Sequence, residues 1–129
     1  MTPGSKIIVI ERNPNFVSIL RETFSDHRLT IYHDSAERVA ELVSRVTDEG
    51  ADYVLSGIPF SFLDTPTRQD IVRQTHRILR EGGKFFLPYQ TFFQHNRHLL
   101  DHMRDTFATA KDEYYLWNVP PMRIYEAVK

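Results

Sequence analysis

The stretch Asp52-Tyr-Val-Leu-Ser-Gly-Ile-Pro-Phe60 decides the fold that the sequence predicts. Residues 53–55 are apolar and favour a β-strand, and the chain then breaks at Ser56-Gly57 and Pro59. A buried strand that ends in a glycine turn is typical of an open parallel sheet, where ligands bind beyond the carboxyl ends of the strands. Gly57 would let the backbone approach a ligand closely, and Phe60 would offer an aromatic face for stacking. The same pattern also fits an ordinary strand, turn and helix without a ligand.

The composition indicates one compact domain over residues 1–129, with 41% hydrophobic residues. The net charge of -1 argues against nucleic acid held by a basic surface. The absence of cysteine excludes disulfides, thiolate metal sites and cysteine catalysis. No apolar run reaches the roughly 18 residues of a membrane-spanning helix, and the first residues do not resemble a signal peptide. We therefore expect a cytoplasmic protein with no nucleic-acid partner and no transmembrane segment.

Strand and helix patterns alternate along the chain. Residues 7–10 are unbroken β-branched sequence, which predicts a strand covered on both faces. Asn13 and Pro14 then predict the start of a helix, because asparagine caps helices and proline suits their first turn. Pro88 is a flaw in the strand predicted at 84–90, because it removes a backbone donor and suggests a bulge or an early end. The elements expected with bounds are strands at residues 7–10, 29–32, 53–55, 84–90, 111–117 and 122–128, and helices at about 65–79 and 92–107.

This alternation predicts an α/β fold. Strands joined by helices imply a mostly parallel sheet with helices on both faces. The last two strands are joined by the short connection 118–121, which predicts an antiparallel hairpin at the C-terminal end.

The order of these parts resembles a class I S-adenosylmethionine-dependent methyltransferase, which has a Rossmann-like sheet. Three motifs look most like those of the phospholipid N-methyltransferase-like branch. They are Ile10-Glu11-Arg12-Asn13-Pro14, Ser56-Gly57-Ile58-Pro59-Phe60 and Leu79-Arg-Glu-Gly-Gly-Lys84. The resemblance covers nearly all of the chain. It does not include the first strand and glycine-rich loop of that family, which would precede Ile7. Because backbone N–H groups of such a loop grip the adenosyl ligand, the resemblance implies a truncated sheet with a weakened cofactor site.

In that family the missing strand lies between the strands predicted here at 7–10 and 53–55. Its absence leaves those two strands either paired directly or with two open edges. Open edges invite pairing with another chain. We therefore expect the sheet to close over the gap or to complete itself as a homodimer.

The resemblance implies that S-adenosylmethionine binds where three strands end. At the first, the Glu11 carboxylate would accept hydrogen bonds from two ribose hydroxyls; the alternative is a solvated acid near a helix start. At the second, Asp34 would contact the adenine amino group; the alternative is a helix cap. The implied cofactor-binding residues are Glu11, Arg12, Asp34, Ser35, Ser56 and Gly57.

The loop after residues 53–55 matches the substrate side of the family. Ser56 is a weaker acceptor than the Asn or Asp of base methyltransferases, so another amine, such as a phospholipid headgroup, is favoured over a nucleobase. Tyr89 would add a cation–π contact to a quaternary or apolar amine. No catalytic residue is assigned, because holding the nucleophile in line with a reactive methyl donor supplies most of the rate. The implied substrate-binding residues are Ile58, Pro59, Phe60 and Tyr89.

Two further clusters have ordinary explanations. One side of the predicted helix at 92–107 carries His95, His98 and His102. This arrangement is more typical of a solvated surface than of a zinc site, so no metal site is assigned. A basic stripe on the preceding helix consists of Arg73, Arg77 and Arg80. It is either a solvated face or a binding surface for an anionic lipid or phosphate. The second alternative would allow peripheral contact with a membrane.

The sequence thus leaves two functions open. The first is methyl transfer to an amine, such as a phospholipid headgroup or another small molecule, with activity of this chain alone in question. The second is a non-catalytic α/β scaffold that acts through dimerisation or protein contacts.

Overall fold

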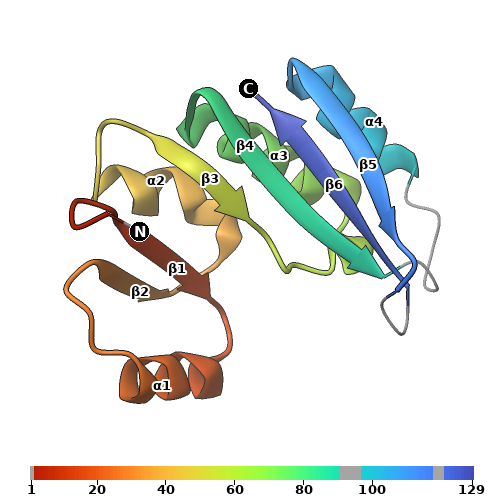
Figure 1. The fold of residues 1–129 in the computed structure, drawn as a ribbon. Coiled ribbons are helices and arrows are strands. Elements are labelled where there is room, and N and C mark those ends of the chain that lie inside the picture. Colours follow the sequence, from red (N-terminus) through yellow and green to blue (C-terminus); the bar gives the residue numbers. More distant parts are fainter. Residues whose placement is uncertain (1, 91–96, 118–120) are drawn as a thin grey trace.

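The computed structural model describes residues 2–90, 97–117 and 121–129, and its strands form two separate sheets (Figure 1). The smaller sheet pairs β1 with β2, and the larger has the order β3-β4-β6-β5. The strands are β1 (Ile7–Glu11), β2 (Leu29–His33), β3 (Ala51–Leu55), β4 (Leu79–Gln90), β5 (Thr109–Tyr115) and β6 (Met122–Val128). The helices are α1 (Pro14–Thr23), η1 (Ala36–Arg38), α2 (Val39–Ser44), η2 (Phe60–Phe62), α3 (Thr65–Ile78) and α4 (Arg97–Thr106).

Helix starts are fixed by short polar side chains. The backbone N–H of Asn15 donates to Asn13 Oδ1 at 2.9 Å, with Pro14 in the first turn of α1, so the predicted start is confirmed. Asp64 caps α3 in the same way, because its Oδ1 accepts from the N–H of Thr67 at 2.8 Å. The predicted end of this helix is also confirmed to within one residue.

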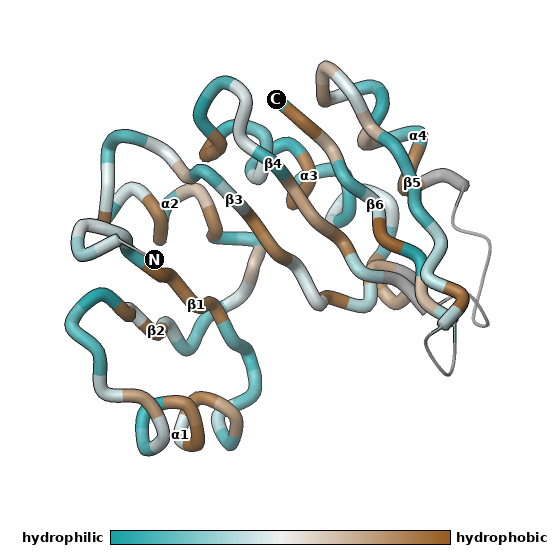
Figure 2. Tube along the Cα trace, viewed as in Figure 1, coloured by the Kyte–Doolittle hydropathy of each residue, from teal (hydrophilic) through white to brown (hydrophobic). Residues whose placement is uncertain are grey.

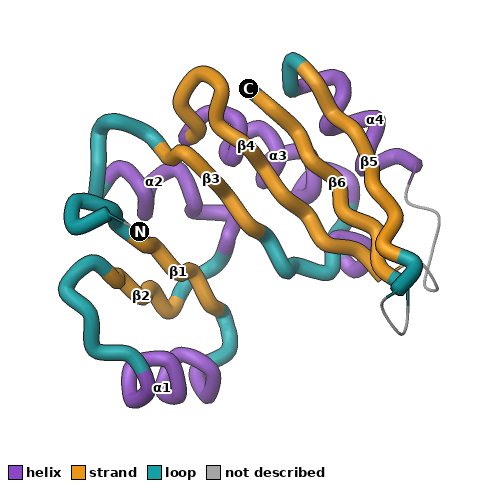
Figure 3. The backbone as a smooth tube through the Cα atoms, viewed as in Figure 1, coloured by secondary structure: helices purple, strands orange, loops and turns teal. Residues whose placement is uncertain are grey.

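Strand directions match the α/β prediction. β1 pairs parallel with β2, and β3 pairs parallel with β4. β6 runs antiparallel to both β4 and β5, which confirms the C-terminal hairpin. β5 therefore runs in the direction of β4. Figure 3 shows all six strands side by side, with a space between β1 and β3.

Pro88 is tolerated in β4 because of where β3 ends. Ser56 N–H donates to the carbonyl O of Phe86 at 3.0 Å, so the backbone of Phe86 faces β3. Backbone groups alternate along a strand, so position 88 faces the same side, beyond the last β3 residue, Leu55, which pairs with Phe86. The missing donor of Pro88 therefore breaks no bond to β3.

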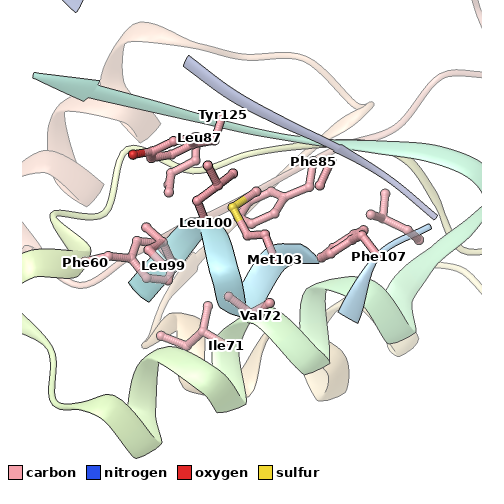
Figure 4. Close-up of a cluster of buried hydrophobic side chains, with 12 residues drawn as sticks. Phe60, Ile71, Val72, Phe85, Leu87, Leu99, Leu100, Met103, Phe107 and Tyr125 are labelled. Carbon is pink, nitrogen blue, oxygen red and sulfur yellow. The ribbon is translucent and has the colours of Figure 1, made fainter. Parts of the chain in front are cut away.

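The core lies between the larger sheet and the two helices α3 and α4. Phe85 and Leu87 of β4 alternate with half-exposed neighbours and are fully buried against α4. Figure 4 shows Leu100 and Met103 of α4 among these side chains. The buried cluster is Phe60, Ile71, Val72, Leu79, Phe85, Leu87, Leu99, Leu100, Met103, Phe107, Tyr125 and Ala127.

Two burial predictions are wrong, for one physical reason. Residues 7–10 were expected to be covered on both faces, yet Ile7 is 39% exposed and the rest of β1 is only partly buried. Tyr53 and Leu55 of the expected buried strand are 70% and 76% exposed. Both strands border the space between the sheets, and neither β1 nor β3 has a partner there among the described residues. Of the two outcomes expected for the sheet, the structure has the two open edges rather than direct pairing of β1 with β3.

Candidate functional site

The carboxyl ends of β1 and β2 meet at Glu11 and Asp34. The backbone N–H of Asp34 donates to the carbonyl O of Glu11 at 3.1 Å. His33 Nε2 lies 3.1 Å from the carbonyl O of Arg12, which fixes the turn after β1. Parallel pairing thus brings together two of the predicted cofactor positions.

One of the two oxygens of the Glu11 carboxylate accepts a hydrogen bond. Its Oε1 accepts from the N–H of Asn13 at 2.6 Å, which holds the side chain against the turn before α1. Its Oε2 has no hydrogen-bond partner within residues 2–90, 97–117 and 121–129. This oxygen is therefore the acceptor that a hydroxyl-bearing ligand could reach.

The Asp34 carboxylate is fully engaged by its own segment. Oδ1 accepts from the N–H of Ser35 at 2.8 Å, and Oδ2 pairs with Arg38 Nη1 at 2.6 Å. Ser35 in turn caps η1, because its Oγ accepts from the N–H of Glu37 at 3.3 Å. The capping alternative therefore describes this turn, and an adenine contact would share an oxygen that already accepts one hydrogen bond.

The turn after β3 leaves the Cα of Gly57 uncovered by other protein atoms. Ser56 is 9% exposed, and its Oγ accepts from the N–H of Ile58 at 3.4 Å. A Cβ added at Gly57 would meet no atom within 4 Å, and the residue does not have a positive φ. Nothing in the fold requires glycine here, so the open approach to the backbone is available to a ligand.

The proposed aromatic face at Phe60 is wrong, because this ring is fully buried in the core (Figure 4). Ile58 also packs against that core, and Pro59 caps η2 without a side-chain hydrogen bond. Phe62, two residues on, is the exposed ring of this loop, with 87% of its surface accessible. Sequence reasoning missed it because a one-turn 3₁₀ helix has no repeat that distinguishes the inner ring from the outer one. Tyr89 lies in β4 opposite Arg123.

Glu11 and Gly57 lie at the same edge of the molecule. β1 and β3 run in one direction on either side of the space between the sheets, so both strands end at that edge (Figure 1). Two surface hollows, of about 480 and 830 Å³, lie elsewhere and have neither residue in their lining. The candidate site is therefore the edge where β1, β2 and β3 end, with its middle left open.

Among the described residues, the clusters outside this edge form no candidate metal site. Within the part of the chain that the structure describes, no group of three His, Asp or Glu side chains is arranged to hold a metal ion. His95 lies outside the described residues. In the basic stripe, Arg73 pairs with Asp70 at 3.5 Å, and Arg80 pairs with Asp52 at 2.5 Å. None of the helices described is both long and apolar enough to cross a membrane.

Solved structures share this arrangement. The N-methyltransferase NodS from Bradyrhizobium japonicum superposes with a TM-score of 0.75, at 8% identity, over 96% of this chain and 73% of its own. The chain has the class I methyltransferase fold. The predicted α/β methyltransferase architecture is thereby confirmed. A second NodS structure, in complex with S-adenosyl-L-homocysteine, superposes on this methyltransferase fold with a TM-score of 0.70 at 10% identity, over 96% of this chain and 66% of its own.

Sequence relatives are methyltransferases as well, although no protein-family profile matches the chain. The ornithine lipid N-methyltransferase of Singulisphaera acidiphila is 26% identical over 130 residues, which cover 95% of this chain and 62% of that enzyme. A human thiol S-methyltransferase is 27% identical over 84 residues, which cover 65% of this chain and 34% of the enzyme. The chain thus has the methyltransferase fold and spans less than two thirds of the length of these relatives.

Proposed function

We propose that this chain is the S-adenosylmethionine-binding part of a methyltransferase that acts on an amine, such as a lipid headgroup. The observation that carries the proposal is the shared edge where β1 and β3 end, with the open Glu11 oxygen on one side and the uncovered Gly57 backbone on the other. The ornithine lipid enzyme, matched over 95% of this chain, supports a lipid amine as the acceptor.

The residues present fit the cofactor in part. Glu11 Oε2 suits a ribose hydroxyl, and Gly57 leaves room for close approach. Asp34 fits less well, because each of its oxygens already accepts one hydrogen bond from its own turn. Within this chain, Glu11 would hold the sugar, and the Ser56–Gly57 backbone would face the reacting end of the ligand.

When bound, the cofactor would supply a sulfonium methyl group to the lone pair of an amine nitrogen, with the electron pair of the broken S–C bond left on sulfur and any N–H proton released to water. The contribution of the protein is to hold that nitrogen in line. Gln90 ends β4 at the same edge, and Phe62 is an exposed ring in the segment that follows Gly57, so the loop 57–64 is the surface that we assign to the acceptor.

Calorimetric titration with S-adenosylhomocysteine tests the proposal. We expect heat at micromolar ligand that is lost in Glu11→Ala, because the open acceptor is removed. Glu22→Ala is the matched control, since Glu22 is exposed on α1 and its side chain makes no hydrogen bond among the described residues; this variant keeps the heat. Equal losses in both variants, or heat unchanged in Glu11→Ala, contradict the assignment of Glu11.

A second candidate function is a non-catalytic scaffold that acts through protein contacts, including a homodimer along the open sheet edges. The exposure of Tyr53 and Leu55 favours it, since apolar strand edges pair readily with other chains. The scaffold predicts no heat even at millimolar S-adenosylhomocysteine. Sedimentation velocity measures the homodimer directly and needs no ligand.

A further inference from the structure

The hairpin of β5 and β6 extends past the end of β3. Leu55, the last residue of β3, pairs with Phe86, whereas β4 continues for four more residues to Gln90. Gln90 and Tyr115, the last residue of β5, both pair with Met122 of β6, so β4 and β5 end at the same level. At about 3.3 Å per residue, this level lies roughly 13 Å beyond the end of β3 (Figure 1). The hairpin therefore stands out from the edge that holds the candidate site.

The turn that follows β5 carries apolar side chains that other residues do not cover. Residues 114–117 read Tyr-Tyr-Leu-Trp, and we call them the hairpin tip. Leu116 is 72% exposed and Trp117 is 98% exposed, and the side chain of neither has a hydrogen bond or ring contact among the described residues. Figure 2 shows the hydrophilic middle of β5 and the hydrophobic colour in the turn after it. The most exposed ring of the described residues thus lies at the end of this protrusion.

Contacts within the hairpin hold the tip in place and pair the charges beside it. The guanidinium of Arg123 lies over the Tyr114 ring, 4.6 Å from its centroid, and also pairs with Asp112. Glu113, the residue before the tip, pairs with Lys111 at 3.1 Å. The tip is therefore a fixed apolar end that can leave water without burying an unpaired charge.

The chemistry of the tip fits the interface of a lipid bilayer. Tryptophan and tyrosine accumulate at that interface, because their rings are apolar while the N–H or O–H group stays hydrated. One aromatic side chain covers about 150–250 Å², so a tip with a single fully exposed ring falls below the about 800 Å² per partner of a stable protein contact. A bilayer needs no complementary surface, because its lipids surround a protruding side chain. The small area therefore favours a lipid surface over a second protein.

We propose that the hairpin tip inserts into the interface of a zwitterionic phospholipid bilayer and places the carboxyl edge of the sheet against the lipid headgroups. This inference rests on the proposed lipid amine acceptor. Interfacial segments insert by about 5–10 Å, so the end of β3 stands roughly 3–8 Å above the plane that the tip enters. A headgroup amine reaches the loop after Gly57 while its acyl chains stay in the bilayer. Phe62, 87% exposed in that loop, is a second aromatic side chain at this edge.

The basic stripe on α3 does not supply the same contact. α3 starts at the carboxyl edge, after β3, and ends at the opposite edge, before β4, so Arg77 and Arg80 lie away from the candidate site. Arg73 and Arg80 each pair with an aspartate. A bilayer held by this stripe would need anionic lipid and would be released by salt. The tip is uncharged, so binding through it depends only weakly on salt.

The fluorescence of the hairpin tip provides a direct test, because Trp117 is the one tryptophan of the sequence. The probe is a vesicle of phosphatidylcholine, with or without bromine on the acyl chains. We expect the wild-type chain to float with the vesicles and its emission to move to shorter wavelength. Bromine high in the acyl chain quenches this emission more strongly than bromine low in the chain, as expected for a ring at the interface.

Leu116→Ser keeps the reporter and lowers the partition into vesicles by about tenfold or more, because apolar surface is withdrawn from the bilayer. Trp117→Ser, followed by flotation, lowers it by a similar factor. Phe24→Ser is the matched control, because Phe24 is also exposed, at 55%, but follows α1 at the opposite edge; its partition is unchanged. Circular dichroism and melting temperature establish that each variant stays folded. Equal losses in Leu116→Ser and Phe24→Ser contradict the assignment of the tip.

Three further results overturn the proposal. The first is a folded wild type that does not float with phosphatidylcholine vesicles, or floats while Trp117 stays in water. The second is binding that requires anionic lipid and is lost in Arg77→Ala, which places the contact at the basic stripe. The third is a dimer in sedimentation that Trp117→Ser abolishes, which makes the tip a contact between two copies. The vesicle measurements use no cofactor and the calorimetry with S-adenosylhomocysteine uses no lipid, so the two proposals can fail separately.

Discussion

Asp34 Oδ2 lies 2.6 Å from Arg38 Nη1, so the acid at the end of β2 is paired within its own turn. The backbone carbonyl of Glu11 accepts a hydrogen bond from the N–H of Asp34 in the same turn. One oxygen of the Glu11 carboxylate has no hydrogen-bond partner among the described residues. Two acids that the sequence placed in one site are therefore unequal. Glu11 offers a ligand hydroxyl an oxygen without a partner, whereas each Asp34 oxygen already accepts one hydrogen bond.

This inequality predicts different effects for the two acids. Asp34→Ala leaves the affinity for S-adenosylhomocysteine within about twofold, whereas Glu11→Ala lowers it by about tenfold or more, as expected for one hydrogen bond to a charged acceptor. Calorimetric titration of both variants in parallel measures the difference. An equal loss in both would show that Asp34 exchanges Arg38 for the ligand.

Gly57→Ala separates binding from stability. The added methyl group meets no protein atom within 4 Å and no strained φ, so the melting temperature stays unchanged. If the ligand approaches this backbone, the methyl group occupies its space and the affinity falls about tenfold. Gly4→Ala is the control, because a Cβ there also meets nothing within 4 Å and the residue lies away from the strand ends. Unchanged affinity in Gly57→Ala would place the ligand elsewhere.

Two leucines in neighbouring strands test the core. Leu87 is fully buried and Leu55 is 76% exposed. Leu87→Ala leaves a cavity between β4 and α4 and lowers the free energy of unfolding by roughly 2–5 kcal/mol. Leu55→Ala changes it by less than about 0.5 kcal/mol. Urea unfolding followed by circular dichroism provides both values, and similar losses would contradict the described core.

The cap of α3 predicts a pH dependence. Hydrogen bonding from Thr67 lowers the pKa of Asp64 below its ordinary value. A carboxyl group whose pKa is lower in the folded than in the unfolded state stabilises the fold at pH values above the unfolded pKa of about 4. This contribution is lost as the pH falls through the folded pKa. Asp64→Asn keeps a capping oxygen that does not titrate. The difference in melting temperature between wild type and Asp64→Asn is therefore constant at neutral pH and changes below about pH 4, to the disadvantage of the wild type.

Asp64→Ala provides the accompanying control. It removes the cap at every pH, so its melting temperature lies below that of Asp64→Asn throughout the range. A wild type and an Asp64→Asn variant that respond identically to acid would exclude the cap as the source of the dependence.

Local signals allowed much of the fold to be predicted from sequence. The cap at Asn13 and the short connection before β6 act within a few residues, so the pattern alone places them. The bulge or early end expected at Pro88 is wrong, because β4 continues to Gln90 in regular register with β6. The reason that the proline is tolerated lies in β3, more than thirty positions away. The exposure of Tyr53 and the burial of Phe60 depend on which elements lie next to them in space, and a strand or loop pattern does not carry that information. The engagement of Asp34 by Arg38 was missed for a related reason, since an acid after a strand suits a ligand and a cap equally.

The division into two sheets affects how the molecule unfolds. No backbone ladder joins β1 to β3 among the described residues, so side chains and the connection through η1 and α2 couple the two parts. Gln74 of α3 holds η1 and α2 in place, with Nε2 donating to Glu37 O at 2.6 Å and Oε1 accepting from Ala40 N–H at 3.2 Å. The small sheet with α1 can therefore melt as a separate cooperative unit while the α3–α4 core stays packed.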